Sequence, residues 1–107
     1  FGSDLDPATQ RQLARGERLM ELIKQPQYSP WRLDHEVMLV YAGTRGYMDS
    51  VAINQIDRWR REFTRYMDTA QPEVGRVIRE SGGWNDKIEN EIKQGLEDFN
   101  ATWSNEA

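Results

Sequence analysis

His35 is the only histidine in the chain and the first residue to test for acid–base or metal chemistry, because Asp34 and Glu36 flank it in sequence. Consecutive residues of a helix point to different faces, so neither neighbouring carboxylate is expected to converge with the imidazole. A helical zinc motif also needs a second histidine four residues away. We therefore interpret Asp34 and His35 as residues of a first helical turn, with no ligand or base role for His35.

Asp4 and Asp6 form a second possible site, since they resemble a pair of catalytic carboxylates. A general acid and base must converge in a cleft, and proximity in sequence alone does not bring this about. Asp6 directly precedes Pro7, a pairing typical of a helix start in which the aspartate caps free amides. We interpret Asp6 as a helix cap and Asp4 as a solvent-exposed residue.

Two short motifs complete the survey. The stretch GTRGY, residues 43–47, has two glycines but no GKS or GKT, the lysine–hydroxyl pair of a phosphate-binding loop, so it indicates a helix end followed by a turn. The stretch Asn100-Ala101-Thr102 matches the N-glycosylation pattern, which we interpret as a chance match. We predict no catalytic, cofactor-binding or metal-binding residues in this sequence.

The charge pattern argues against nucleic acid as a partner. The formal net charge is -4, and residues 71–107 hold four basic and eight acidic residues. Trp59 and Tyr66 alternate with arginines, an arrangement that could stack on bases. They also share the spacing of an apolar helical stripe, so we expect them in the core instead.

Length and composition favour one soluble, helical domain covering residues 1–107. The sequence is 37% hydrophobic and 30% charged, and it contains no cysteine. No apolar run approaches the roughly 20 residues of a membrane-spanning helix, so we expect no direct membrane insertion. The first residue is Phe rather than Met, so we expect a longer parent protein.

Apolar periodicity predicts an all-α fold, an irregular bundle of about five helices. The first helix is expected over about 7–24, followed by a loop at 26–30. The second should begin near Asp34, with Leu33 and Met38 as a hydrophobic staple, and end near residues 43–46. The run VMLVYA within it should be central and buried.

The remaining three helices follow a connector at residues 46–53. The third should begin near Asn54, with Asp57 completing a weak capping box. The fourth should begin at Pro72 and end at Gly82. The fifth should begin near Asn85 and carry its apolar residues on one stripe through residue 103.

Two long strings resemble a known family. FGSDLDPATQRQLARGERLMELIKQPQYSP (residues 1–30) and YAGTRGYMD (residues 41–49) are similar to the helical C-terminal domain of the F-type ATP synthase α subunit. The similarity extends to about residue 99 and is looser after residue 51. It implies a non-catalytic structural domain of the α subunit within a proton-translocating complex that makes and hydrolyses ATP.

The resemblance also implies partners and a location. In this family α and β subunits alternate around a rotor shaft, the γ subunit, so β and γ are the expected partners. ATP, ADP and magnesium bind upstream domains, and no cofactor is expected in residues 1–107. The complex would lie at the cytoplasmic face of a bacterial inner membrane, or on the mitochondrial matrix or chloroplast stroma side. By position in the family, Ser3, Asp4, Leu5 and Asp6 are the candidate rotor-facing surface.

Two further hypotheses accompany this interpretation. The protein could instead be an independent helical protein-interaction module, which would bind an unrelated partner and ignore β and γ. A domain separated from its neighbours also exposes apolar surface, so we expect the isolated domain to self-associate.

Overall fold

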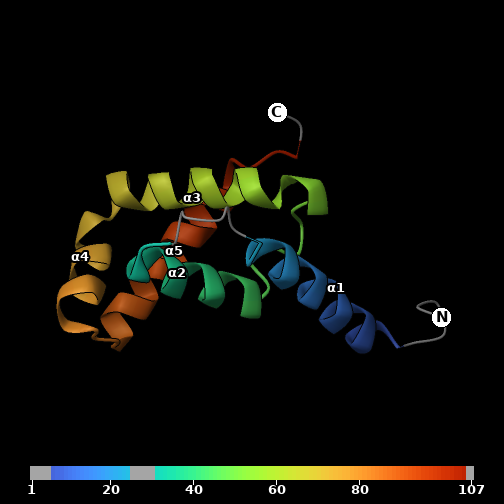
Figure 1. The fold of residues 1–107 in the computed structure, drawn as a ribbon, viewed down its shortest axis with the longest axis horizontal. Helices are drawn as coiled ribbons and strands as arrows, with labels where there is room; N and C mark the ends of the chain where they lie inside the picture. Colours follow the sequence, from blue (N-terminus) through green and yellow to red (C-terminus); the bar gives the residue numbers. More distant parts are fainter. Residues whose placement is uncertain (1–5, 25–30, 106–107) are drawn as a thin grey trace.

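The computed structural model describes residues 6–24 and 31–105, which form five α-helices, one short 3-10 helix and no strand. The elements are α1 (Pro7–Leu22), α2 (Leu33–Thr44), η2 (Ile53–Gln55), α3 (Ile56–Ala70), α4 (Pro72–Ser81) and α5 (Asp86–Ala101). In Figure 1, α3 runs along the bundle above α2, and α4 closes one end. Helix α1 leaves the opposite end and projects away from the bundle (Figure 1). The expected all-α architecture is confirmed for these residues.

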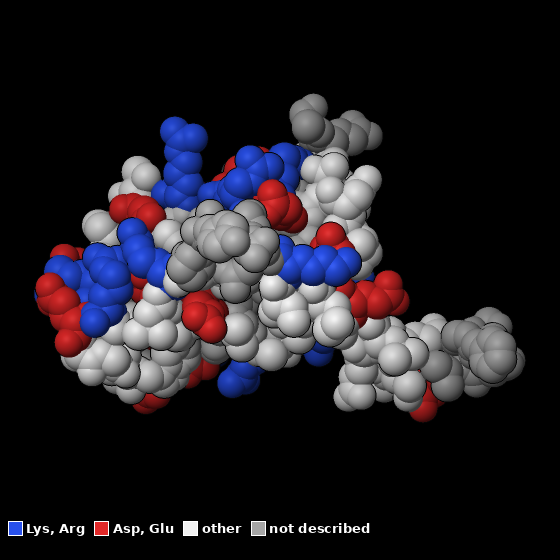
Figure 2. Space-filling model, viewed as in Figure 1, with Lys and Arg blue, Asp and Glu red and all other residues white. Residues whose placement is uncertain are grey.

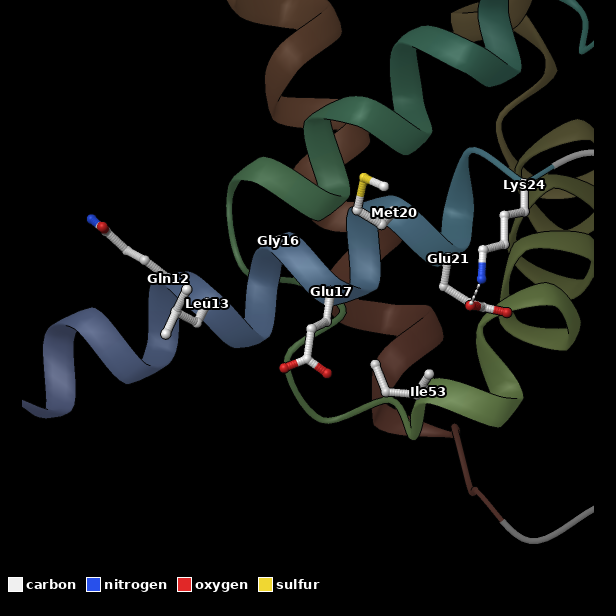
Figure 3. A pocket seen from close by; sticks show the side chains of 8 residues that line it. All are labelled: Gln12, Leu13, Gly16, Glu17, Met20, Glu21, Lys24 and Ile53. Atoms are coloured by element: carbon white, nitrogen blue, oxygen red, sulfur yellow. Dashed lines mark hydrogen bonds and ion pairs between the residues drawn. The ribbon is translucent and has the colours of Figure 1, made fainter. Parts of the chain in front are cut away.

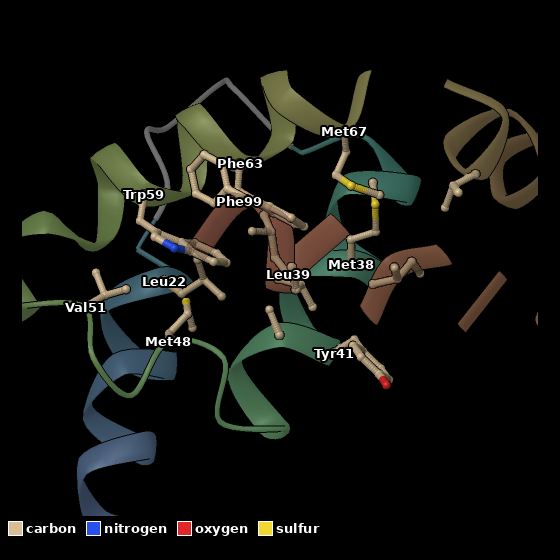
Figure 4. Packing of buried hydrophobic residues seen from close by; sticks show 14 of the residues in the cluster. Leu22, Met38, Leu39, Tyr41, Met48, Val51, Trp59, Phe63, Met67 and Phe99 are labelled. Carbon is tan, nitrogen blue, oxygen red and sulfur yellow. The ribbon is translucent and has the colours of Figure 1, made fainter. Parts of the chain in front are cut away.

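The core lies where α1, α2, α3 and α5 meet (Figure 4). Trp59 and Phe63 of α3 are fully buried and stack with ring centroids 5.0 Å apart. Phe99 of α5 meets the edge of Trp59 at 5.8 Å, an arrangement that aromatic pairs favour. Leu22 brings the end of α1 into the same cluster, and Val74 and Ile78 add α4, so all five helices share one continuous core.

Four helix boundaries follow the local sequence signals. Asp6 Oδ1 accepts a hydrogen bond from the Thr9 amide at 2.7 Å, with Pro7 as the first helical residue of α1. Asn85 Oδ1 caps α5 by accepting from the Ile88 amide at 2.9 Å. Helix α4 begins at Pro72 and ends at Gly82, whose φ of 61° suits glycine. These expected boundaries are confirmed.

Helix α2 begins at Leu33, next to the expected Asp34, but the expected hydrophobic staple is wrong. Arg32 is the N-terminal flanking residue, and Asp34 lies inside the first turn with its side chain buried. Leu33 is 53% exposed while Met38 is buried, so the two do not form the expected staple. The Asp34 side chain can be buried because its carboxylate binds Arg32, which directly precedes α2, and Arg79 of α4, as described below.

Smaller differences concern the end of α1 and the start of α3. Helix α1 ends at Leu22, two residues before the expected position. Helix α3 begins at Ile56 after η2, without a side-chain cap. The expected capping box is therefore wrong, since the Asp57 carboxylate instead binds Arg60 and Arg61. The expected loop at 26–30 lies outside the described residues. Among the residues that the structure describes, no helix is long and apolar enough to cross a membrane.

Candidate functional site

Asp6, one of the four residues of the predicted rotor-facing surface, lies at the N-terminal end of α1. Ser3, Asp4 and Leu5 lie outside the described residues, so Asp6 alone is placed. Asp6 is exposed, and hydrogen bonds from the backbone and side chain of Thr9 hold the pKa of its carboxyl below its usual range. Asp6 is thus a charged helix cap at the end of α1 that projects from the bundle (Figure 1).

A cluster of charged side chains that sequence reasoning did not anticipate joins α2, α3 and α4. We call it the ionic cluster, and it consists of Arg32, Asp34, His35, Asp68 and Arg79. Asp34 is fully buried. Its carboxylate accepts from Arg32 Nε at 2.8 Å, from Arg32 Nη2 at 2.7 Å and from Arg79 Nη1 at 2.9 Å.

Asp68 of α3 brings a second carboxylate to His35. His35 Nε2 lies 3.0 and 3.1 Å from the two Asp68 oxygens, and Arg32 Nη2 lies 2.7 Å from Asp68 Oδ1. The expectation from the sequence concerned only the neighbouring carboxylates of Asp34 and Glu36; it missed Asp68, and it is wrong for Asp34, which lies in the same cluster as His35. Asp68 lies 33 residues further along the sequence, and no local spacing pattern signals a contact that only tertiary packing creates.

The cluster has the composition of a metal site, since Asp34, His35 and Asp68 offer ligand atoms that all lie within 4.8 Å of one another. However, Arg32 Nη2 already lies within 3.0 Å of all three of these side chains. Its two hydrogens serve the two carboxylates, which leaves His35 Nε2 to donate its own hydrogen to Asp68. The guanidinium thus supplies the positive charge that a metal ion would bring, and the geometry favours a closed ion-pair network.

Two features show how tightly the ionic cluster is built. Burial by itself raises the pKa of Asp34, but the hydrogen bonds from Arg32 and the charges of His35, Arg32 and Arg79 outweigh burial, so this pKa is lowered. Gly75 of α4 packs directly on the Asp34 carboxylate, and a Cβ at Gly75 would overlap it. Helix α4 can approach α2 this closely only because residue 75 has no side chain.

Asn100, the residue of the glycosylation-like stretch, has a structural task. Its Oδ1 accepts from Trp59 Nε1 at 2.9 Å, and its Nδ2 donates to the Tyr47 carbonyl at 2.8 Å. Both ends of the amide are therefore used inside the fold, in line with a chance match to the motif. The stretch GTRGY ends α2 and turns at Gly46, whose φ is 85°.

Apolar surface is exposed along α1. Leu13 is 52%, Met20 61% and Ile23 54% exposed, so the core of this domain leaves these apolar side chains uncovered. Leu13, Gly16 and Met20 line a shallow groove together with Ile53 (Figure 3), which we call the α1 groove. In the space-filling view the projecting end of α1 is mostly uncharged, whereas intermixed basic and acidic side chains cover α3 and α4 (Figure 2).

The comparison with known families agrees with this architecture. The model of the family described as "ATP synthase alpha/beta chain, C terminal domain" matches residues 1–99, which is almost the whole sequence. The matched span equals the span over which the two sequence strings and the looser apolar spacing indicate this family. The protein therefore belongs to the family of C-terminal domains of ATP synthase alpha and beta subunits.

Proposed function

We propose that this protein is the C-terminal helical domain of an ATP synthase α subunit and that its role is mechanical. In this proposal it lines the central rotor shaft, packs against neighbouring β subunits, and leaves nucleotide and magnesium binding to other domains of the complex. The observation that carries the choice of α over β is the pair of sequence strings at residues 1–30 and 41–49. The family match supports the complex as a whole.

The exposed apolar face of α1 supports a role in subunit packing. A side chain such as Met20, 61% exposed beside Leu13 and Ile53, gains from burial against a second surface. Glu17 and the Glu21–Lys24 ion pair flank the α1 groove, which gives it the apolar centre and polar rim of protein interfaces. We therefore place the β contact on the α1 groove.

The rigid body behind α1 supports a mechanical role. A close-packed interior transmits displacement with little compression, and here Trp59, Phe63 and Phe99 fill the space between α3 and α5. The ionic cluster adds a second, polar link between α2, α3 and α4. A domain of this kind resists deformation when its surface is pushed.

Charge at the start of α1 supports the rotor contact. A rotating shaft needs contacts that are individually weak, and exposed charges screened over about 8 Å at physiological salt are of this kind. Asp6 is exposed and ionised, and its position at the projecting end of α1 leaves it free to face a partner. We propose that Ser3, Asp4, Leu5 and Asp6 together face the rotor.

The subunit assignment is tested by binding. The protein is mixed with purified α, β and γ subunits of one ATP synthase and analysed by size-exclusion chromatography. Co-elution with β is expected, and a Leu13→Glu/Met20→Glu variant should lose it, while a control Val40→Glu on α2, at an apolar residue that is 43% exposed, should keep it. Co-elution with α rather than β would mean that the protein is of the β type.

The rotor contact needs an assembled complex. Changing Asp4 and Asp6 to Asn removes both charges, and Asn at position 6 retains the capping oxygen that α1 requires. A changed rotational torque is expected, with Asp86→Asn, in the first turn of α5, as the matched control. Unchanged torque and coupling in the double variant would remove the rotor-steering role from these residues.

A further inference from the structure

The last described residues pack against the rest of the fold. Residues 102–105, which we call the C-terminal tail, follow α5 and lie beyond the span that the family model matches. The tail contacts residues 50 and 52 of the connector between α2 and η2, residues 45–52. This contact joins two segments that are about half the sequence apart.

Asn105 makes the most specific contacts of the tail. Its Oδ1 accepts from the Ala52 amide at 2.9 Å, and its Nδ2 donates to the Ser50 carbonyl at 3.1 Å. The same Oδ1 also accepts from Trp103 Nε1 at 3.0 Å, which orients the amide. One side chain therefore bonds the connector backbone at two points, as a neighbouring strand would.

Arg58 of α3 holds the tail from the other side. Its guanidinium lies 4.0 Å from the ring centroid of Trp103, and its Nη2 donates to the Ser104 carbonyl. Trp103 in turn packs on Phe99, with centroids 6.1 Å apart. The tail is thus fixed to α3 and α5 before it reaches the connector.

Helix α1 also contacts the connector, through two arginine side chains. Arg18 Nε donates to the Val51 carbonyl at 2.9 Å, and the Arg15 guanidinium binds the Asp49 carboxylate at 3.1 Å. A Cβ at Gly46 would lie 2.5 Å from Arg15 Nη2, so this arginine also packs closely on the turn. The connector is therefore held between α1 and the C-terminal tail.

We propose that the C-terminal tail is a clasp that fixes the connector and, through it, the direction in which α1 leaves the bundle. Leu19 and Leu22 seat the C-terminal end of α1 in the core, while the N-terminal half of the helix projects from the bundle. Arg15 and Arg18 anchor the middle of α1 to the connector, and Asn105 anchors the connector to the tail. Opening the clasp loosens the projecting half of α1 without unfolding the helices behind it.

The test is hydrogen exchange of the full-length sequence, resolved by amide, with Asn105→Ala compared against Asn90→Ala, an exposed asparagine in the middle of α5. Loss of one or two hydrogen bonds should speed exchange of the Ala52 amide about threefold to tenfold. The clasp also predicts faster exchange at Asp49, at Val51 and through α1, with α4 unchanged. The Asn90 variant should leave all of these rates as they are.

The second part of the test is a double-mutant comparison of Arg18→Ala and Asn105→Ala. Arg18→Ala alone should speed exchange in α1, and adding Asn105→Ala should add little there, because the path from tail to helix is already cut. A change confined to Ala52 would reduce Asn105 to a local contact and overturn the proposal. Equal acceleration of α1 and α4 would overturn it as well, since it would reflect global destabilisation. A truncated variant ending at Thr102 provides the same comparison with the contacts of Trp103, Ser104 and Asn105 removed.

Discussion

Gly75 of α4 lies against the buried carboxylate of Asp34 in α2, in the space that any side chain at position 75 would need. This contact allows α2 and α4 to pack closely. The Asp34 carboxylate lies between the two helices, and Gly75 leaves room for it because it has no side chain. Arg79, one turn further along α4, then completes the bonds to Asp34.

The first prediction concerns Gly75→Ala. A Cβ there would overlap Asp34 Oδ2 and lie 3.1 Å from Arg79 Nη1, so the ion pairs must shift. We expect a loss of about 1–3 kcal/mol in the free energy of unfolding, typical of an overpacked site, despite the better helix propensity of alanine. Urea denaturation followed by circular dichroism measures it.

The matched control is Gly16→Ala in α1. Gly16 is also helical, but nothing lies within 4 Å of a Cβ built there. Alanine should therefore stabilise the protein by about 0.5–1 kcal/mol. Effects of the same sign at both glycines would contradict the close contact between α4 and Asp34.

The second prediction concerns acid. Because the pKa of Asp34 is lower in the folded protein than its ordinary value of 3.8, the folded state favours the ionised form. Its stabilising effect is therefore complete above about pH 4 and is lost as the pH falls through the lower, folded value. We expect the unfolding free energy to decline with acid in this window.

Asp34→Asn isolates that contribution. The amide cannot pair with both Arg32 and Arg79, so stability at neutral pH should fall by about 1–3 kcal/mol, the partly exposed arginines being able to turn to water. The decline with acid should become shallower than in the parent protein. Asp98→Asn on the exposed side of α5 serves as the control. An unchanged acid slope in Asp34→Asn would show that other carboxylates govern the transition.

The third prediction concerns Tyr41. Burial raises the pKa of its phenol to about 12, and the hydrogen bond that its hydroxyl donates to Glu89 Oε2 at 3.0 Å adds to the effect. Since the folded value is raised, the stabilisation is complete below about pH 10 and is lost as the pH rises through about 12. Ultraviolet titration should show a late phenol component that Tyr41→Phe removes.

Local signals in the sequence predicted much of the fold, and the reasons are specific. Pro7, Pro72 and Gly82 act through their own backbone geometry, and Asn85 acts on an amide three residues away, so each boundary is readable in place. The stripe of α3 is also local, because its spacing matches the helical repeat. The family was readable from two uninterrupted strings.

The ionic cluster and the clasp could not be predicted in this way. Asp68 reaches His35 across 33 residues, and Asn105 reaches Ala52 across 53. Such contacts depend on how the helices pack, and neither spacing nor composition encodes them. Asp34 shows this most clearly: its place in the first turn of α2 was predicted, but its burial was not, because that burial depends on two arginines, one of them from α4.

The last prediction concerns oxidation by hydrogen peroxide, which converts a methionine thioether to its sulfoxide and releases water. Met20 is 61% exposed in the α1 groove, whereas Met38, Met48 and Met67 are each 1% exposed in the core. The folded protein should therefore gain one oxygen, on Met20, before any of the others react, as peptide mapping by mass spectrometry would show. A polar sulfoxide in the α1 groove should also weaken co-elution with β, and a Met20→Leu variant should resist both effects. Early oxidation of Met38 or Met67 under native conditions would contradict the packing of α2 and α3 described above.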